Sequence, residues 1–267
     1  MRRSNFRNMK RKIVTCGKGG CGKTSFTMLA ATVLSKKGIL VDVIDSDESN
    51  PSLHRLLGVA APKTLVEYLG GRRQVANMMS KEKQGHTSQE AETQMSIADI
   101  PQKYVSSSSS KGIRLLVTGK ITSFFEGCAC PINYVTRSFL KNLKLGKNEI
   151  VLVDTDAGIE HVGRGVEEGA DIILAIVDPA YDSILIAEKI SEISKSLGKE
   201  TWAIINKSDP RIEKQIKASL KKRGVKIAGQ VEYDRKLLKS NLSGTPYKAS
   251  SALKCVEKIL EKIKILT

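Results

Sequence analysis

The segment GKGGCGKT at residues 17–24 decides the fold of this chain. It matches G-x-x-x-x-G-K-[ST], the pattern of a loop that binds the phosphates of a nucleoside triphosphate. Glycines let backbone N–H groups converge on phosphate oxygens without obstruction from Cβ atoms. We expect the Lys23 ammonium to neutralise the β- and γ-phosphates and the Thr24 hydroxyl to ligate Mg²⁺. The predicted phosphate site comprises Gly17, Lys18, Gly19, Gly20, Cys21, Gly22, Lys23, Thr24 and Ser25.

The residues on either side of this loop predict its structural setting. Residues 12–16 form an apolar run typical of a short strand, and residues 23–37 carry apolar side chains at helical spacing. Residues 39–44 form a second apolar strand that ends at an Asp-Ser-Asp sequence. Strand, loop, helix and strand in this order open a parallel α/β sheet, and the helix directs its positive N-terminal end at the bound anion.

Further strands are expected where apolar residues run on almost without interruption, which is typical of strands covered on both faces. An amphipathic helix is expected at residues 250–266. The prediction is an α/β fold, a mostly parallel sheet flanked by helices on both faces, forming one P-loop NTPase domain over residues 1–267. The further strands are expected at residues 113–117, 150–153, 172–177, 202–205 and 225–228.

Two segments lack this pattern of apolar strands and amphipathic helices. Residues 1–11 form a basic N-terminal extension, and residues 81–111 are polar and include five consecutive serines at 106–110. We expect the second segment to be a mobile surface insert, with docking of a partner as the alternative.

The formal charge of +16 fits either an acidic partner or solvated lysine-rich helix faces. No aromatic pattern is interleaved with the basic residues, so nucleic acid is not an expected partner. The sequence lacks 18 uninterrupted apolar residues, and its basic start lacks the apolar region of a secretory signal. A cytoplasmic protein without a membrane partner is therefore expected.

Lys18 adds a second lysine to the loop. The form K-G-G-x-G-K-[ST] resembles the deviant Walker A loop of the nitrogenase iron protein, MinD and ParA superfamily. In that superfamily the early lysine reaches across a dimer to the nucleotide of the other subunit. The resemblance implies a homodimer in which Lys18 acts in catalysis beside Lys23, whereas a basic residue without this role is the alternative.

Acidic residues follow two of the predicted strands. Asp47 occupies the place of the superfamily's switch I aspartate, which orients the attacking water, and Asp45 is expected near the hydration shell of Mg²⁺. Alternatively, both aspartates cap the following helix. Asp154 ends an apolar strand and is expected to hold Mg²⁺ through a water. Gly158 is expected to direct its N–H at the γ-phosphate, as part of switch II.

The nucleotide base is expected near Asn206 and Lys207, which begin an N-K-x-D sequence at residues 206–209. That pattern is typical of guanine recognition, but in MinD-like ATPases a strand-end asparagine commonly contacts adenine. Val231 and Glu232 lie in a segment that resembles the base-side loop of those ATPases. ATP is favoured, with GTP as the alternative.

Cys128 and Cys130 are two residues apart. In extended backbone their thiolates project to the same side and could chelate one soft or borderline metal ion. A twofold dimer would supply two more thiolates and complete a four-sulfur site. The alternative is a pair of buried, inert side chains.

The sequences GCACP at residues 127–131 and DAGIEHVGRG at residues 156–165 look like those of the CooC family. These are accessory ATPases that mature nickel-containing carbon monoxide dehydrogenase, and the related factor for acetyl-CoA synthase is similar. The resemblance implies an ATP-driven metallochaperone that holds Ni²⁺, or Zn²⁺ in its place, between the paired cysteines of a dimer. It also implies an apo-enzyme of one of these two types as the client. His161 could couple the phosphate and metal sites.

This chain departs from the CooC pattern in its basic extension, in its polar insert and in Cys21, where valine is common. Cys21 could be oxidation-sensitive or merely tolerated. Two other functions remain open: an iron–sulfur carrier that uses the same cysteines, and a ParA/MinD-like positioning ATPase that acts on DNA or membrane.

Overall fold

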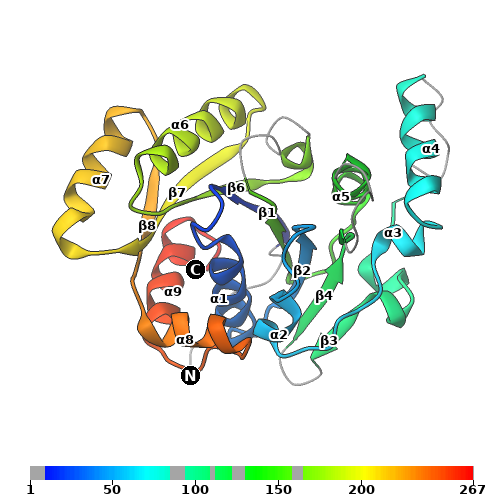
Figure 1. Ribbon diagram of the computed structural model, residues 1–267, viewed down its shortest axis with the longest axis horizontal. Helices are drawn as coiled ribbons and strands as arrows, with labels where there is room; N and C mark the ends of the chain where they lie inside the picture. The colour runs from blue at the N-terminus through cyan, green and yellow to red at the C-terminus, as the bar shows by residue number, and fades with distance from the viewer. Residues whose placement is uncertain (1–9, 85–93, 109–111, 122–129, 158–164, 267) are drawn as a thin grey trace.

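The computed structural model describes residues 10–84, 94–108, 112–121, 130–157 and 165–266. Within these residues eight strands form one sheet in the order β3-β4-β2-β5-β1-β6-β7-β8 (Figure 1). All neighbouring strands are parallel except β3 and β4. The predicted mostly parallel α/β sheet is confirmed. The strands are β1 (Lys10–Gly17), β2 (Leu40–Ser46), β3 (Ser106–Ser108), β4 (Ile113–Val117), β5 (Glu149–Thr155), β6 (Ile172–Val177), β7 (Glu200–Ser208) and β8 (Ile227–Glu232).

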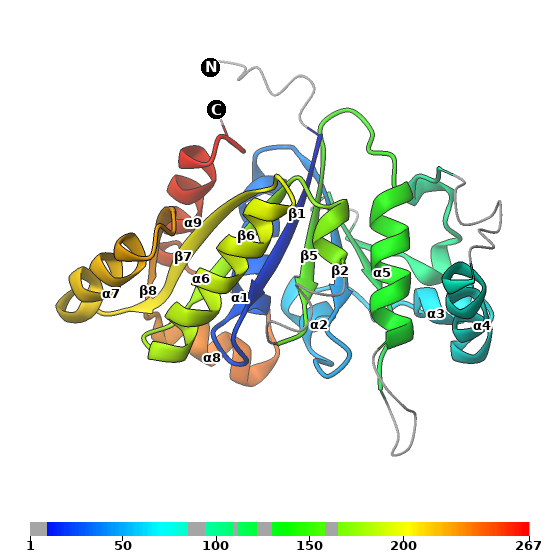
Figure 2. The same cartoon turned by 90° about the horizontal axis from the view of Figure 1, so that it is seen from above.

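Helices cover both faces of the sheet (Figure 2). One layer holds α1 (Lys23–Lys36), α2 (Leu53–Leu57), α8 (Arg235–Ser243) and α9 (Ser251–Lys262). The other layer holds α5 (Cys130–Asn142), α6 (Tyr181–Ser196) and α7 (Pro210–Lys222), with α3 (Leu65–Tyr68) and α4 (Arg72–Lys83) packed beside α5. Short 3₁₀ turns complete the described chain at Ile97–Asp99, Gln102–Tyr104 and Val166–Gly169.

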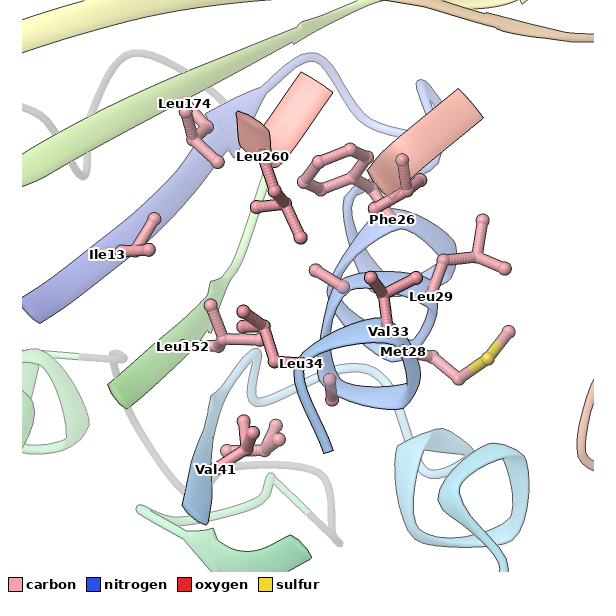
Figure 3. Packing of buried hydrophobic residues seen from close by; sticks show 14 of the residues in the cluster. Ile13, Phe26, Met28, Leu29, Val33, Leu34, Val41, Leu152, Leu174 and Leu260 are labelled. Atoms are coloured by element: carbon pink, nitrogen blue, oxygen red, sulfur yellow. The ribbon is translucent and has the colours of Figure 1, made fainter. Parts of the chain in front are cut away.

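The core is aliphatic and lies on both sides of the central strands. Figure 3 shows the side chains of α1 facing those of the strands and α9, with Phe26, Leu34, Leu152 and Leu260 all buried. Every residue of β5 and β6 is buried, which explains why β6 is apolar throughout and β5 is apolar from Ile150 to Val153. Burial of these side chains provides the main stabilisation of the sheet.

The polar segment at residues 81–111 requires a correction in its described part. Ile97, Ile100 and Tyr104 are buried in the core, and the first three of the five serines form β3, antiparallel to β4. This part is therefore not a surface excursion. Serine is not typical of strands, but here backbone hydrogen bonds to β4 define the strand. Residues 85–93 and 109–111, like residues 1–9 of the basic extension, lie outside the described residues.

The strand predicted at residues 225–228 is displaced towards the C-terminus, because β8 begins at Ile227. Val225 instead ends the turn after α7, where its N–H donates to Leu220 O at 3.1 Å. Gly224 adopts a positive φ of 69° in that turn. Val225 is buried because it packs at the end of this helix, which is a common position for an apolar residue after a helix C-terminus.

No helix within the described residues is long and apolar enough to cross a membrane.

A buried ionic cluster joins three neighbouring strands. Arg114 of β4 donates from Nε to Asp42 Oδ1 of β2 at 2.5 Å and from Nη2 to Oδ2 at 2.9 Å, and Nη2 also donates to Glu149 of β5. Desolvation by burial is the largest effect on Asp42 and raises the pKa of its carboxyl to about 7, although Arg114 acts in the opposite direction. Ionisation of Asp42 is therefore less favourable in the folded chain than in the unfolded chain.

We expect Asp42→Asn to flatten the pH dependence of stability. Because the pKa of Asp42 is raised on folding, this group reduces the free energy of unfolding as pH rises from about 4 to about 7. The variant cannot ionise here, so its stability relative to wild type should rise between pH 5 and pH 8. Urea unfolding across that range measures this, with Asp171→Asn on the surface as the control. Parallel curves for Asp42→Asn and wild type would contradict the prediction.

Candidate functional site

The phosphate loop joins β1 to α1, and its glycines are required by its shape. Gly17, Gly20 and Gly22 have φ values of 146°, 76° and 102°. A Cβ on Gly17 would lie 2.5 Å from Ile176 O, and one on Gly22 would lie 2.1 Å from Asn206 Nδ2. The first turn of α1 has neither an acidic residue nor a side-chain cap. The N–H groups of this turn are thus available to an anion.

Lys23 and Thr24 start α1 next to the loop. The Lys23 side chain is buried, and its ammonium donates to Gly17 O at 3.3 Å and to Lys18 O at 3.4 Å. The Thr24 hydroxyl oxygen accepts from Asn50 Nδ2 at 2.9 Å. Mg²⁺ would use a lone pair of the same oxygen, so Asn50 lies directly beside the predicted metal ligand. Asn50 thus belongs to the site, although no sequence pattern indicated it.

Two buried carboxylates face each other at the ends of neighbouring strands. Asp45 of β2 is the register partner of Asp154 of β5, and both are at most 2% exposed. Burial, followed by repulsion from Asp45, raises the pKa of Asp154 to about 7. Burial likewise raises the pKa of Asp45 to about 6, opposed by Lys120. Asp154 Oδ2 has no hydrogen-bond partner within the described chain. These donors fit Mg²⁺, which binds oxygen ligands and retains waters that carboxylates can hold.

Asp47 lies in the loop after β2 and shapes it locally. Its Oδ1 accepts from the Ser49 N–H at 2.9 Å and from Ser49 Oγ at 2.6 Å. The Ser52 N–H at the start of α2 instead donates to Asn50 Oδ1, at 3.0 Å. Helix capping therefore does not explain either aspartate. The Asp47 N–H donates to Asp45 Oδ1 at 3.2 Å, so Asp47 lies beside the strand-end carboxylate, which is compatible with the expected contact to the attacking water.

Lys120 is a site residue that the sequence did not indicate. Its ammonium donates to Asp45 Oδ2 at 2.8 Å, to Asp47 O and to Asn50 O at 2.6 Å. The side chain is only 20% exposed. No motif contains this lysine, because its contacts join residues about 70 positions apart.

Lys18 points away from the loop towards α6. Its ammonium lies 3.6 Å from Asp182 Oδ2, and both side chains are substantially exposed. Exposed ion pairs of this kind contribute little to stability and are readily exchanged. Lys18 is therefore accessible to another anionic group.

Two residues predicted to contact the base bond the phosphate loop instead: Asn206 Nδ2 donates to Cys21 O at 2.8 Å, and Lys207 Nζ donates to Gly20 O at 2.6 Å. Asp209 is the N-cap of α7: it accepts from the Arg211 N–H at 2.9 Å and pairs with the Arg211 guanidinium. These hydrogen bonds lower the pKa of Asp209 to about 2. Asp209 therefore acts as a local helix cap in this structure.

Val231 and Glu232, at the end of β8, differ in accessibility. Val231 is buried in the core, so only its backbone could face a base, whereas Glu232 is exposed. Near them, Asn241 of α8 donates to Ser25 Oγ at 2.9 Å and links α8 to the start of α1.

The cysteines divide between described and undescribed residues. Cys130 is the first residue of α5 and is half-buried, while Cys128, like Gly158 and His161, lies outside the described residues. Burial raises the pKa of Cys21 to about 11, which keeps this thiol protonated and does not favour oxidation. Among the residues that the structure describes, no group of three or more His, Cys, Asp or Glu side chains is arranged to hold a metal ion.

The glycine loop, the open start of α1 and the paired strand-end carboxylates define a P-loop nucleotide-binding protein. Residues 12–247 match the family described as the CobQ/CobB/MinD/ParA nucleotide binding domain. The chain belongs to this family and is a P-loop ATPase.

Relatives of the chain include uncharacterized and named proteins. An uncharacterized ATP-binding protein of Methanocaldococcus jannaschii is 45% identical over 252 residues, which cover 94% of this chain and 100% of the relative. The carbon monoxide dehydrogenase accessory protein CooC of Rhodospirillum rubrum is 32% identical over 196 residues, or 71% of each chain. The septum site-determining protein MinD of Pyrococcus horikoshii, solved with Mg-ADP, has the same fold, with a TM-score of 0.65, 19% identity and 96% coverage of both chains.

Gly22→Ala should reduce nucleotide affinity by tenfold or more, because the added Cβ would meet Asn206 and displace the loop. Gly38→Ala is the matched control, since Gly38 also has a positive φ (78°) but has nothing within 4 Å of its added Cβ. The control should lose about 1 kcal/mol of stability and keep its affinity. Titration with a fluorescent ATP analogue, together with thermal unfolding, compares the two. Equal affinities would contradict the prediction.

Proposed function

We propose that this ATPase is a metallochaperone that binds Ni²⁺ between paired cysteines of a dimer and releases it to a client enzyme under control of ATP. One structural observation carries the proposal: the helix that begins at Cys130 is hydrogen-bonded to the last residue of β2, next to the loop that would sense the nucleotide. Thr136 of α5 shares a 2.7 Å hydrogen bond with Ser46, and it donates to Thr118 Oγ1 at 3.0 Å. Ser46 lies between Asp45 and Asp47 in the sequence, so the cysteine-bearing helix contacts the end of the strand from which the candidate switch residues extend.

The nucleotide would be held by the phosphate loop. Lys23 would contact the β- and γ-phosphates, Thr24 would ligate Mg²⁺, and Asp154 would hold a water of the metal. Bound Mg²⁺ supplies positive charge that offsets the charge developing on the phosphates during transfer. Asp47 would orient the attacking water, and Asn206 and Lys207 would hold the loop against the base side.

A homodimer would complete both sites. Lys18 is exposed, and its contact with Asp182 is weak, so it is available to the nucleotide of a partner subunit. Two copies of the Cys128–Cys130 pair would supply four thiolates, a set that suits Ni²⁺ or Zn²⁺. ATP would close the dimer around the metal, and hydrolysis would reopen it.

The similarity to the CooC protein of Rhodospirillum rubrum supports the choice of client. We infer that the client is an apo carbon monoxide dehydrogenase, or an acetyl-CoA synthase, whose nickel site is filled from the dimer. An iron–sulfur carrier that uses the same cysteines is the competing function.

Lys18→Ala should abolish ATP-dependent dimerisation but leave ATP affinity within about threefold of wild type, because Lys23 and the loop glycines remain. Asp182→Ala is the companion variant. It removes only the partner of Lys18, and its effect on stability should be below about 1 kcal/mol, with dimerisation retained. Light scattering with ADP and with ATP gives the molecular mass in each state. A Lys18→Ala protein that dimerises like wild type would refute the role of Lys18.

The double variant Cys128→Ala/Cys130→Ala should lose stoichiometric metal binding and retain nucleotide binding. Cys255→Ala, on α9, is the control and should bind metal normally. Metal analysis of anaerobically purified protein, before and after addition of nickel, provides the measurement. Retention of bound nickel by the double variant would exclude the assignment, and a brown, oxygen-sensitive wild-type protein would favour the iron–sulfur carrier.

A further inference from the structure

Lys120 lies in the connection that leaves β4 towards α5. The connection is held beside the end of β2, because the Thr118 N–H donates to Asp45 O at 2.9 Å. The side chain of Lys120 then turns inward, and 80% of its surface is shielded from solvent. Burial of an ammonium is costly, so its contacts must compensate for lost hydration.

Those contacts use the full donor capacity of the ammonium. A lysine ammonium has three N–H donors, and Lys120 has three oxygen acceptors: the Asp45 carboxylate and the main-chain carbonyls of Asp47 and Asn50. One side chain therefore fixes both the carboxylate at the end of β2 and the loop that follows it. Asn50 extends the same network to Thr24 at the start of α1.

The charges at this place explain why a cation is needed there. Asp45 and Asp154 are buried register partners, and two ionised carboxylates so close together repel each other. The positive charge of the Lys120 ammonium beside Asp45 reduces that repulsion in the absence of a metal ion. Mg²⁺ bound through Thr24 would bring two positive charges to the same carboxylates.

We propose that Lys120 is a positioning residue for ATP hydrolysis, serving as the internal counter-ion of the Asp45–Asp154 pair and as the anchor of the Asp47–Asn50 loop. This role requires no contact with the phosphates or the attacking water. It acts through Asp45 and through the loop carbonyls, which set where Asp47 stands relative to the phosphate loop. This role is independent of the metal that the cysteines would bind.

Three variants test the proposal in the full-length protein. Lys120→Met removes the charge and its hydrogen bonds, and Lys120→Arg retains the charge and several donors. Lys12→Met is the matched control, because Lys12 is also half-buried and donates to a main-chain carbonyl, that of Leu140. The measurements are the melting temperature with and without Mg²⁺ in the absence of nucleotide, ATP affinity without Mg²⁺, and single-turnover hydrolysis of ATP with Mg²⁺.

For Lys120→Met we expect hydrolysis to slow by about tenfold or more, since small displacements of positioning groups have large effects on rate. ATP affinity without Mg²⁺ should stay within about threefold of wild type, because Lys23 is unchanged. Mg²⁺ alone should raise the melting temperature of Lys120→Met but not of wild type or Lys12→Met, because the metal replaces the missing charge. Lys120→Arg should recover part of the hydrolysis rate.

Wild-type hydrolysis by Lys120→Met would overturn the proposal. It would also be overturned if Lys120→Met were merely unstable, with no specific response to Mg²⁺ and no recovery in Lys120→Arg, since a purely structural lysine behaves in this way. If Lys120→Met does not fold, Lys120→Gln carries the test, because it removes the charge but keeps N–H donors: unchanged hydrolysis, together with no rise of its melting temperature with Mg²⁺, would reject the role.

Discussion

The parallel register of β1, β5 and β2 is the constraint on which the rest of the site depends. Thr15 of β1 pairs with Asp154 of β5, and Asp154 pairs in turn with Asp45 of β2. Because parallel strands end at one edge of the sheet, this register brings the phosphate loop and both carboxylates into line there. The sheet is stable because its central strands are buried on both faces, and that burial also removes the carboxylates from water. The features that stabilise the fold therefore prepare a place for a cation.

The parts of this site that follow from local chain chemistry are predictable from the sequence. The glycine loop is one such part, since only glycine tolerates the positive φ angles and close contacts of Gly17 and Gly22. The buried strands are another, because apolar runs such as those of β5 and β6 suit strands covered on both faces. The order of the strands, by contrast, depends on packing between distant segments.

Lys120 and Asn50 were not predictable for the same reason. Each acts through contacts that form only after the chain has folded, and neither belongs to a spacing pattern. The serines of β3 show the converse problem: their composition suggests an exposed loop, but pairing with β4 outweighs intrinsic preference. The apolar character of Val225 suggests a strand, but this residue is buried because it packs against the C-terminal end of α7. In each case a tertiary contact determines the outcome.

The site is unusual in how closely its acidic loop and the cysteine-bearing helix are joined. Ser46, at the end of β2, and Thr136 share a buried hydrogen bond, so a displacement of Ser46 would break this bond unless α5 followed. A lost hydrogen bond of this kind costs about 1–3 kcal/mol, which is within the usual range of coupling energies between two sites. The hydrogen bond between Ser46 and Thr136 thus joins the end of β2 directly to α5.

The short serine strand β3 also has a consequence for how copies of the protein can meet. β3 is only three residues long and is an edge strand of the sheet. An edge strand as short and polar as this gives a second molecule little backbone to pair with, and its serine side chains offer no apolar surface. Growth of the sheet from one molecule into the next is thereby discouraged on this side.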